Sequence, residues 1–170
     1  IDSVVASAEY SPNSGLLIAS SIIKRGTAVL NVAGDLEPRK VVSQRGLTTY
    51  EWDEGMGINA KVQLADAQLA DLLQIIGQQQ KIPVTGTIAM NAHVLGTLKN
   101  LDGSGHLSLS KGVAYGEEYD SAVTDLTAHG QDIELSNVLL KLHGMQIGGN
   151  GGYDLANSHL HGHIAGQHLV

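Results

Sequence analysis

The 170-residue sequence contains no cysteine and no phenylalanine, one tryptophan and three prolines. Without cysteine the chain forms no disulfide, holds no zinc through thiolates and uses no cysteine nucleophile. Aromatic residues make up 4% of the chain, whereas a globular core usually draws much of its buried area from Phe and Trp. Burial must therefore come from Leu, Ile, Val and Ala, which suits a thin sheet better than a thick core.

Positive charge is also scarce. The formal net charge is −7, and the ten Lys and Arg residues form no stripe apart from the short pairs Lys24-Arg25 and Arg39-Lys40. This distribution argues against a nucleic-acid surface, and we interpret the two pairs as solvated turn charges. No apolar run reaches the roughly 18 residues of a membrane-spanning helix, and no signal peptide is recognisable. The apolar share of 42% is too high for a disordered chain.

Glycine is abundant, with 21 residues. In the segment 82–116 the glycines interrupt runs of alternating apolar and polar residues. One parity of this segment is apolar over Val84, Ile88, Met90 and Val94, and the alternate positions include Thr85, Thr87, Asn91 and His93. Leu107 and Leu109 then alternate with His106 and Ser108. Successive side chains of a strand point to opposite faces, so these runs predict strands with one apolar and one polar face.

The same pattern recurs along most of the chain. Strands are predicted over 4–10, 16–23, 27–36, 48–52, 56–64, 117–129, 131–143, 145–155 and 158–166, with a solvated loop over 37–46. A change of parity after Leu135 predicts a bulge near Asn137. About ten strands in meander order are typical of a sandwich or barrel, and an open, elongated sheet curled on itself fits equally well.

One segment has the helical period instead. Residues 66–77 place apolar side chains at Leu69, Leu72, Leu73 and Ile76. Asp66 is suited to the N-cap and Gly77 to the left-handed C-cap. The predicted organisation is thus one β-rich segment, 1–170, whose helix separates strand blocks 1–64 and 82–170. We interpret the helix as a lid on an apolar sheet surface, with a plug or a contact to another chain as alternatives.

The order of these elements resembles the repeated strand units of AsmA-like and TamB-type envelope proteins of Gram-negative bacteria. The resemblance covers about half the chain, from Leu64 onward, and begins with the helix LADLLQIIG and the strand PVTGTIAMNAHVLGTLKN. The glycine-bounded pattern is then filled by Gly103, Gly105, Leu107, Leu109, Gly112, Gly116, Gly148, Gly149, Gly151, Gly152, Tyr153, Asp154 and Leu155.

The resemblance implies a mainly β fold, in which a curled, antiparallel-rich sheet forms an open, taco-shaped groove with one short amphipathic helix. It implies a slice of a longer repeat array, located in the periplasm and anchored in the inner membrane in the full-length chain. The implied function is bridge-like phospholipid transport between the inner and outer membranes. The alternative is a scaffold for outer-membrane protein assembly that works with a barrel partner. The implied partners are phospholipid acyl chains, and no cofactor is expected.

The predicted groove has a basis in the residues themselves. Its candidate lining is Val84, Ile88, Met90, Val94, Leu107, Leu109, Met145, Ile147, Tyr153 and Leu155. If the sheet curls without closing, this strip can hold acyl chains, and each buried methylene contributes about 0.8 kcal/mol. The competing interpretation is a sandwich core in which the same strip is filled by the protein's own side chains.

The chemistry-bearing residues favour no enzyme. His159, His161 and His163 share one strand face, but an i to i+4 separation of about 13 Å is too long for one metal ion, so we expect a polar outer face. The glycine run 148–152 is followed by a strand, and therefore lacks the helix N-terminus of a phosphate loop.

Overall fold

The chain folds into one large open sheet and a small hairpin. The computed structural model describes residues 1–75, 83–97, 99–130, 132–154, 157 and 159–168. Ten strands pair antiparallel in the order β1-β2-β3-β6-β7-β8-β9-β10-β11-β12, and β4 and β5 form a separate two-stranded sheet. The elements are β1 (Ser3–Ser11), β2 (Gly15–Arg25), β3 (Ala28–Glu37), β4 (Arg39–Val42), β5 (Thr48–Glu51), β6 (Gly57–Gln68), α1 (Leu69–Ile75), β7 (Thr87–Thr97), β8 (Asn100–Ala114), β9 (Glu117–His129), β10 (Asp132–Leu142), β11 (Met145–Asp154) and β12 (His159–His168).

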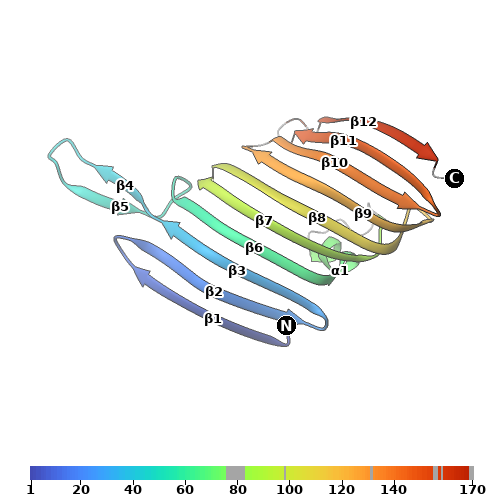
Figure 1. Cartoon of the computed structure of the whole chain (residues 1–170). Helices are drawn as coiled ribbons and strands as arrows, with labels where there is room; N and C mark the ends of the chain where they lie inside the picture. The colour runs from blue at the N-terminus through green and yellow to red at the C-terminus, as the bar shows by residue number, and fades with distance from the viewer. Residues whose placement is uncertain (76–82, 98, 131, 155–156, 158, 169–170) are drawn as a thin grey trace.

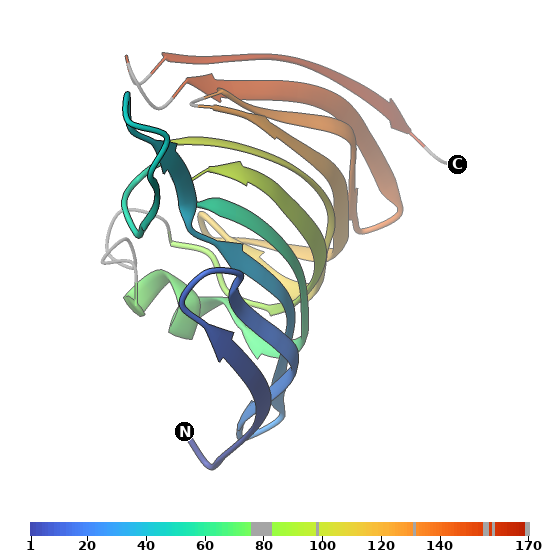
Figure 2. The same cartoon turned by 90° about the vertical axis from the view of Figure 1, so that its left-hand side faces the viewer.

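The sheet is bent into a trough. Figure 1 shows the strands lying side by side from β1 to β12, with the β4–β5 hairpin projecting beyond the ends of β3 and β6. Viewed along the sheet in Figure 2, each strand is an arc, and α1 lies on the concave side. The strand ends thus form two rims, and β1 and β12 are the free edges. The predicted antiparallel, mainly β sheet that stays open is confirmed.

Strand pairing assigns every side chain to one face, because directly paired residues of an antiparallel ladder point to the same side. One ladder runs through Ala8, Ile18, Gly34, Ala60, Val94, Gly103, Ala128, Ile133 and Tyr153. It is apolar throughout. A hollow under α1 is lined by Leu72 of the helix and by Leu64 and Ala67, which belong to this same face. The face on which the ladder lies is therefore the concave one.

Small residues allow the bend. On the concave face a Cβ added to Gly34 would lie 2.2 Å from the carbonyl oxygen of Asn59, and one added to Gly105 would lie 2.8 Å from that of Asn91. Side chains converge on the inside of a curved sheet, so the neighbouring backbone occupies the space that a side chain needs. Glycines at the middle of the strands are therefore part of the reason why the sheet curls.

The predicted bulge in β10 is confirmed. The register to β11 shifts between Leu135 and Val138, and Asn137 has a φ of 52°. Asn tolerates this left-handed conformation better than most residues. The Thr124 hydroxyl donates to the Ser136 carbonyl at 3.0 Å, beside the bulge. The bulge keeps both Leu135 and Val138 on the concave face.

The predicted start of the helix was wrong. Helix α1 begins at Leu69, and residues 66–68 are the last residues of β6. Asp66 is no N-cap, because it has a φ of 51° in a second bulge, where the β6–β7 register shifts between Leu64 and Ala67. The Leu69 amide donates to the Gly86 carbonyl at 2.9 Å, so the strand ladder holds the helix start. The predicted helix end, including Ile76 and Gly77, lies outside the described residues.

The predicted loop 37–46 was also wrong in part, because Arg39–Val42 is strand β4 and pairs with β5. Two contacts support the base of this hairpin. Arg39 forms ion pairs with Glu51 and Asp53, and its guanidinium lowers the pKa of the Asp53 carboxyl. The rings of Tyr10 and Trp52 lie 5.9 Å apart. An isolated two-stranded hairpin is marginally stable, so these contacts hold it in place.

Candidate functional site: an apolar concave face

The structure gathers the predicted groove residues on one surface. Ile88 pairs with Leu109 and Met90 with Leu107, and the ladders through β9 and β10 carry the same face to β11. The predicted residues on the concave face are Ile88, Met90, Val94, Leu107, Leu109, Met145, Ile147 and Tyr153. Leu155 lies outside the described residues.

Val84 does not belong to this surface. It lies before β7 and forms an isolated bridge with Ala114, whereas Ile88 pairs with Leu109. Ala114 and Leu109 have opposite parity in β8, so the side chain of Val84 points to the convex face. The cause is Gly86, whose φ of 135° breaks the alternation between the two positions. The interpretation of Val84 as a groove residue is therefore corrected.

The concave face is not a filled core. The buried apolar residues of the described chain are Ala67, Leu73, Ile88 and Tyr119, and none of its large side chains is fully buried. Apolar concave-face residues near the edges are open, with Val4 56% and Ile164 78% exposed. Monomeric proteins rarely expose contiguous apolar patches larger than a few hundred Å² without a binding function. This face therefore has the character of a binding surface.

The floor of the trough holds an apolar depression of about 220 Å³. Its concave-face lining is Ala92, Val94, Gly103, Gly105, Leu126, Ala128 and Ile133. The two glycines create the space, and Leu126 and Ile133 border it. Sequence reasoning did not select Leu126, Ala128 or Ile133, although each has the concave parity of its strand. The missing signal was register, which joins these positions to Gly103 and Gly105.

Helix α1 covers one part of the trough near a rim. Leu73 is 7% exposed, and the concave-face residues Ala67 and Ile88 are buried as well. The predicted lid residues Leu69 and Leu72 are half-buried, and Leu72 borders a hollow of about 270 Å³ between helix and sheet. The helix leaves the depression around Gly105 uncovered, since none of the depression's lining residues belongs to it.

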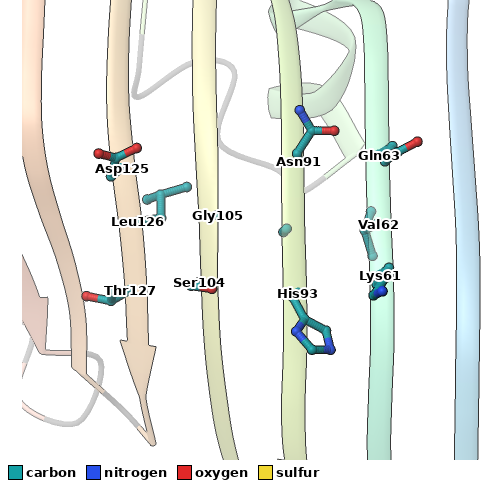
Figure 3. Close-up of a pocket in the computed structure, with 11 residues that line it drawn as sticks. Lys61, Val62, Gln63, Asn91, His93, Ser104, Gly105, Asp125, Leu126 and Thr127 are labelled. Carbon is teal, nitrogen blue, oxygen red and sulfur yellow. The ribbon is translucent and has the colours of Figure 1, made fainter.

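The convex face carries polar side chains along the middle of β6 to β9, where cross-strand hydrogen bonds join them, and it exposes apolar residues such as Leu17 and Ile22 nearer the β1 edge. His106 Nδ1 lies 2.8 Å from Asp125 Oδ1, and Asn137 donates to the other oxygen of Asp125 at 2.8 Å. Figure 3 shows a shallow hollow of about 520 Å³ on this side of the sheet, which is bordered by Asn91 and His93 on β7 and by Asp125 on β9. The polar residues of its lining all have convex-face parity. Such cross-strand pairs fix register and solvate the outer face.

Asp125 gives this polar network a pH dependence. Hydrogen bonds from Asn137 and then His106 lower its pKa. A lowered carboxyl pKa stabilises the fold above the unfolded-state value of about 4, and this contribution is lost as pH falls through the folded-state pKa. We expect Asp125→Asn to lower the urea midpoint of unfolding slightly near neutral pH, with a gap to wild type that narrows as pH falls below about 4. Chemical denaturation across this range measures the gap, and a constant gap would contradict the explanation.

The histidine cluster of β12 faces the convex side, as the parity predicted. His161 pairs across β11 with Glu134, and the ring of His159 stacks on that of His161. Within the described part of the chain no three His, Asp or Glu side chains are placed to hold one metal ion.

Fold and surface together define a class: an open, trough-shaped antiparallel sheet with an apolar concave face and a convex face that is polar along its middle strands. No protein-family model, curated protein or solved structure matches this chain. Among the described residues, no helix has the length and apolar character needed to cross a bilayer.

Proposed function

We propose that the trough holds the acyl chains of lipids and passes them along its length, leaving their head groups at the open side. The observation that supports this proposal is the apolar ladder that crosses the sheet from Ala8 to Tyr153 on a face that the chain leaves unfilled. Burial of apolar surface is non-directional, so such a face binds alkyl chains without selecting one lipid.

The dimensions suit this ligand. Neighbouring strands lie roughly 4.8 Å apart, so the nine gaps between ten strands span about 43 Å. An acyl chain in one leaflet occupies about 15 Å, half of the hydrocarbon thickness of a bilayer. The trough is therefore longer than one acyl chain, and a lipid can occupy successive positions along it without leaving the apolar surface.

The resemblance to AsmA-like and TamB-type proteins supports the same proposal and gives it a setting. In that setting the chain is a segment of a periplasmic conduit that carries phospholipid between the two membranes of a Gram-negative envelope. The proposed ligands are the acyl chains of phospholipids, and the proposed process requires no catalytic residue of this chain.

The test uses two neighbouring positions of β8 that face opposite ways. A photo-crosslinking amino acid at Leu107, on the concave face, is expected to capture lipid from cells, whereas one at His106, on the convex face, is not. Mass spectrometry of the purified protein identifies the adduct and any co-purifying lipid. Equal capture from both positions, or capture from His106 alone, would refute a lipid-holding concave face.

A further inference from the structure

The β4–β5 hairpin is an exposed apolar finger on one rim of the trough. Val42 is 60% exposed and Leu47 67% exposed. They flank the turn, where the Ser43 amide donates to the Leu47 carbonyl at 2.8 Å and Gly46 takes a φ of 75°. The hairpin is not hydrogen-bonded into the ten-stranded sheet, and it projects away from it (Figure 1).

The two aliphatic side chains lie on different faces of the finger. Val42 pairs with Thr48 and shares its face with Lys40 and Tyr50. Leu47 follows the turn with the opposite parity. A tip that is apolar on both faces does not pack on one flat protein surface. It suits insertion into a medium that surrounds it.

The charge of the finger is opposite to that of the chain. Residues 40–50 contain Lys40 and Arg45 and no acidic residue, whereas the whole chain carries −7. Neither cation forms an ion pair within the described residues, while Arg39, at the base, is paired with Glu51 and Asp53. Tyr50 and Trp52 are 39% and 42% exposed below the tip.

This order of residues matches the profile of a bilayer surface. Aliphatic side chains occupy the tip, cations lie at the tip and beside it, and Tyr and Trp follow toward the base. Trp and Tyr favour the membrane–water interface, Lys and Arg extend their charged ends to it along apolar stems, and each cation near an anionic surface contributes about 1 kcal/mol.

We propose that the β4–β5 hairpin docks on the surface of an anionic phospholipid bilayer by inserting Val42 and Leu47 between the head groups. Docking would bring one rim of the trough to the membrane. The proposal stands on the hairpin alone and holds whatever the trough contains. A protein partner for the same tip is the competing interpretation, and it predicts that the chain binds neither kind of vesicle.

The experiment measures binding of the whole chain to phosphatidylcholine vesicles with and without phosphatidylglycerol, by co-sedimentation. Binding is expected only with phosphatidylglycerol. The double variant Lys40→Gln/Arg45→Gln is expected to bind roughly 25-fold more weakly, from about fivefold per cation. The matched control, Lys24→Gln/Arg25→Gln, removes the same charge from the end of β2, where these residues lie in the strand and not in a turn, and is expected to bind like wild type. Equal weakening in both doubles would overturn the proposal, because it would indicate a general charge effect.

Insertion has its own readout, since Trp52 is the single tryptophan of the chain. In a Trp52→Phe background, Leu47→Trp is expected to shift its emission to the blue with phosphatidylglycerol vesicles. The control is Tyr115→Trp in the same background, at a turn residue that is 72% exposed; its emission is expected to stay unchanged. If the emission of Leu47→Trp does not shift and the chain does not sediment with vesicles, membrane docking is overturned. Lipid crosslinking at Leu107 tests the trough separately, so its result does not depend on the result for the hairpin.

Discussion

Leu126→Asp is expected to remove bound lipid from the protein and to reduce acyl-chain binding at least tenfold. Leu126 borders the apolar depression at Gly105, on the concave face. An alkyl chain lying there would cover the new carboxylate. Burying an unpaired carboxylate is costly enough that it protonates or excludes the ligand, and tenfold corresponds to about 1.4 kcal/mol. Mass spectrometry of co-purifying lipid and titration with a fluorescent fatty acid measure the change.

The matched control is the next residue of the same strand. Thr127 has convex-face parity and lies beside Asp125 in the polar hollow. Thr127→Asp adds the same charge within one residue of Leu126, so it reproduces any general effect on β9. We expect it to leave lipid binding unchanged. If both variants lose lipid equally, the concave face is not the binding surface.

Alternation in the sequence predicted which face each groove residue takes wherever a strand is uninterrupted. Met90 and Leu107 lie more than a dozen residues apart, yet each parity alone placed them correctly, and the ladder joins them directly. The bulge at Asn137 was predictable for the same reason, because apolar residues changed parity there. A period of two is a local property, so local sequence contains it.

The wrong predictions, for Val84 and Asp66, occur where a residue with positive φ interrupts the alternation of side chains along the strand. Val84 and Ile88 have the same parity, but Gly86 between them takes a left-handed conformation and reverses the side of Val84. Asp66 looked like a helix cap and is instead a bulge residue of β6. In both cases the chain alternates on either side of one residue with positive φ, and nothing in the residue type alone requires that conformation.

The curvature of the sheet is the other property that the alternating pattern does not predict. Alternation fits a sandwich, a barrel and an open sheet alike, because all three have one apolar face. The structure decides through the concave-face glycines, where the neighbouring strand's carbonyl lies within 3 Å of the missing Cβ at Gly34, Gly105, Gly149 and Gly162. The sequence shows that these positions are glycines. That they lie on the same face of the sheet follows only from the strand register, which the sequence does not give.

Gly34→Ala should therefore destabilise the fold strongly, by about 3 kcal/mol. The added Cβ would lie 2.2 Å from the Asn59 carbonyl oxygen and 2.7 Å from the Cα of Ala60. Both are backbone atoms of β6, so no side-chain rotation relieves the contact, and β3 and β6 must move apart or the bend must flatten. Gly34 is not among the glycines with positive φ, so the penalty is steric. Urea denaturation monitored by circular dichroism measures the free energy of unfolding.

Gly166→Ala tests whether curvature, rather than the loss of any strand glycine, is responsible. Gly166 lies in β12 in register with Ile147, on the same concave face, but a Cβ added there meets nothing within 4 Å. Alanine in an unstrained strand position removes backbone freedom from the unfolded chain, so this variant is expected to match wild type or to gain about 0.5 kcal/mol. Comparable losses in both variants would contradict the steric account. A loss confined to Gly34→Ala would mean that glycine is needed on the inside of the bend, where it both shapes the trough and leaves its floor open to a ligand.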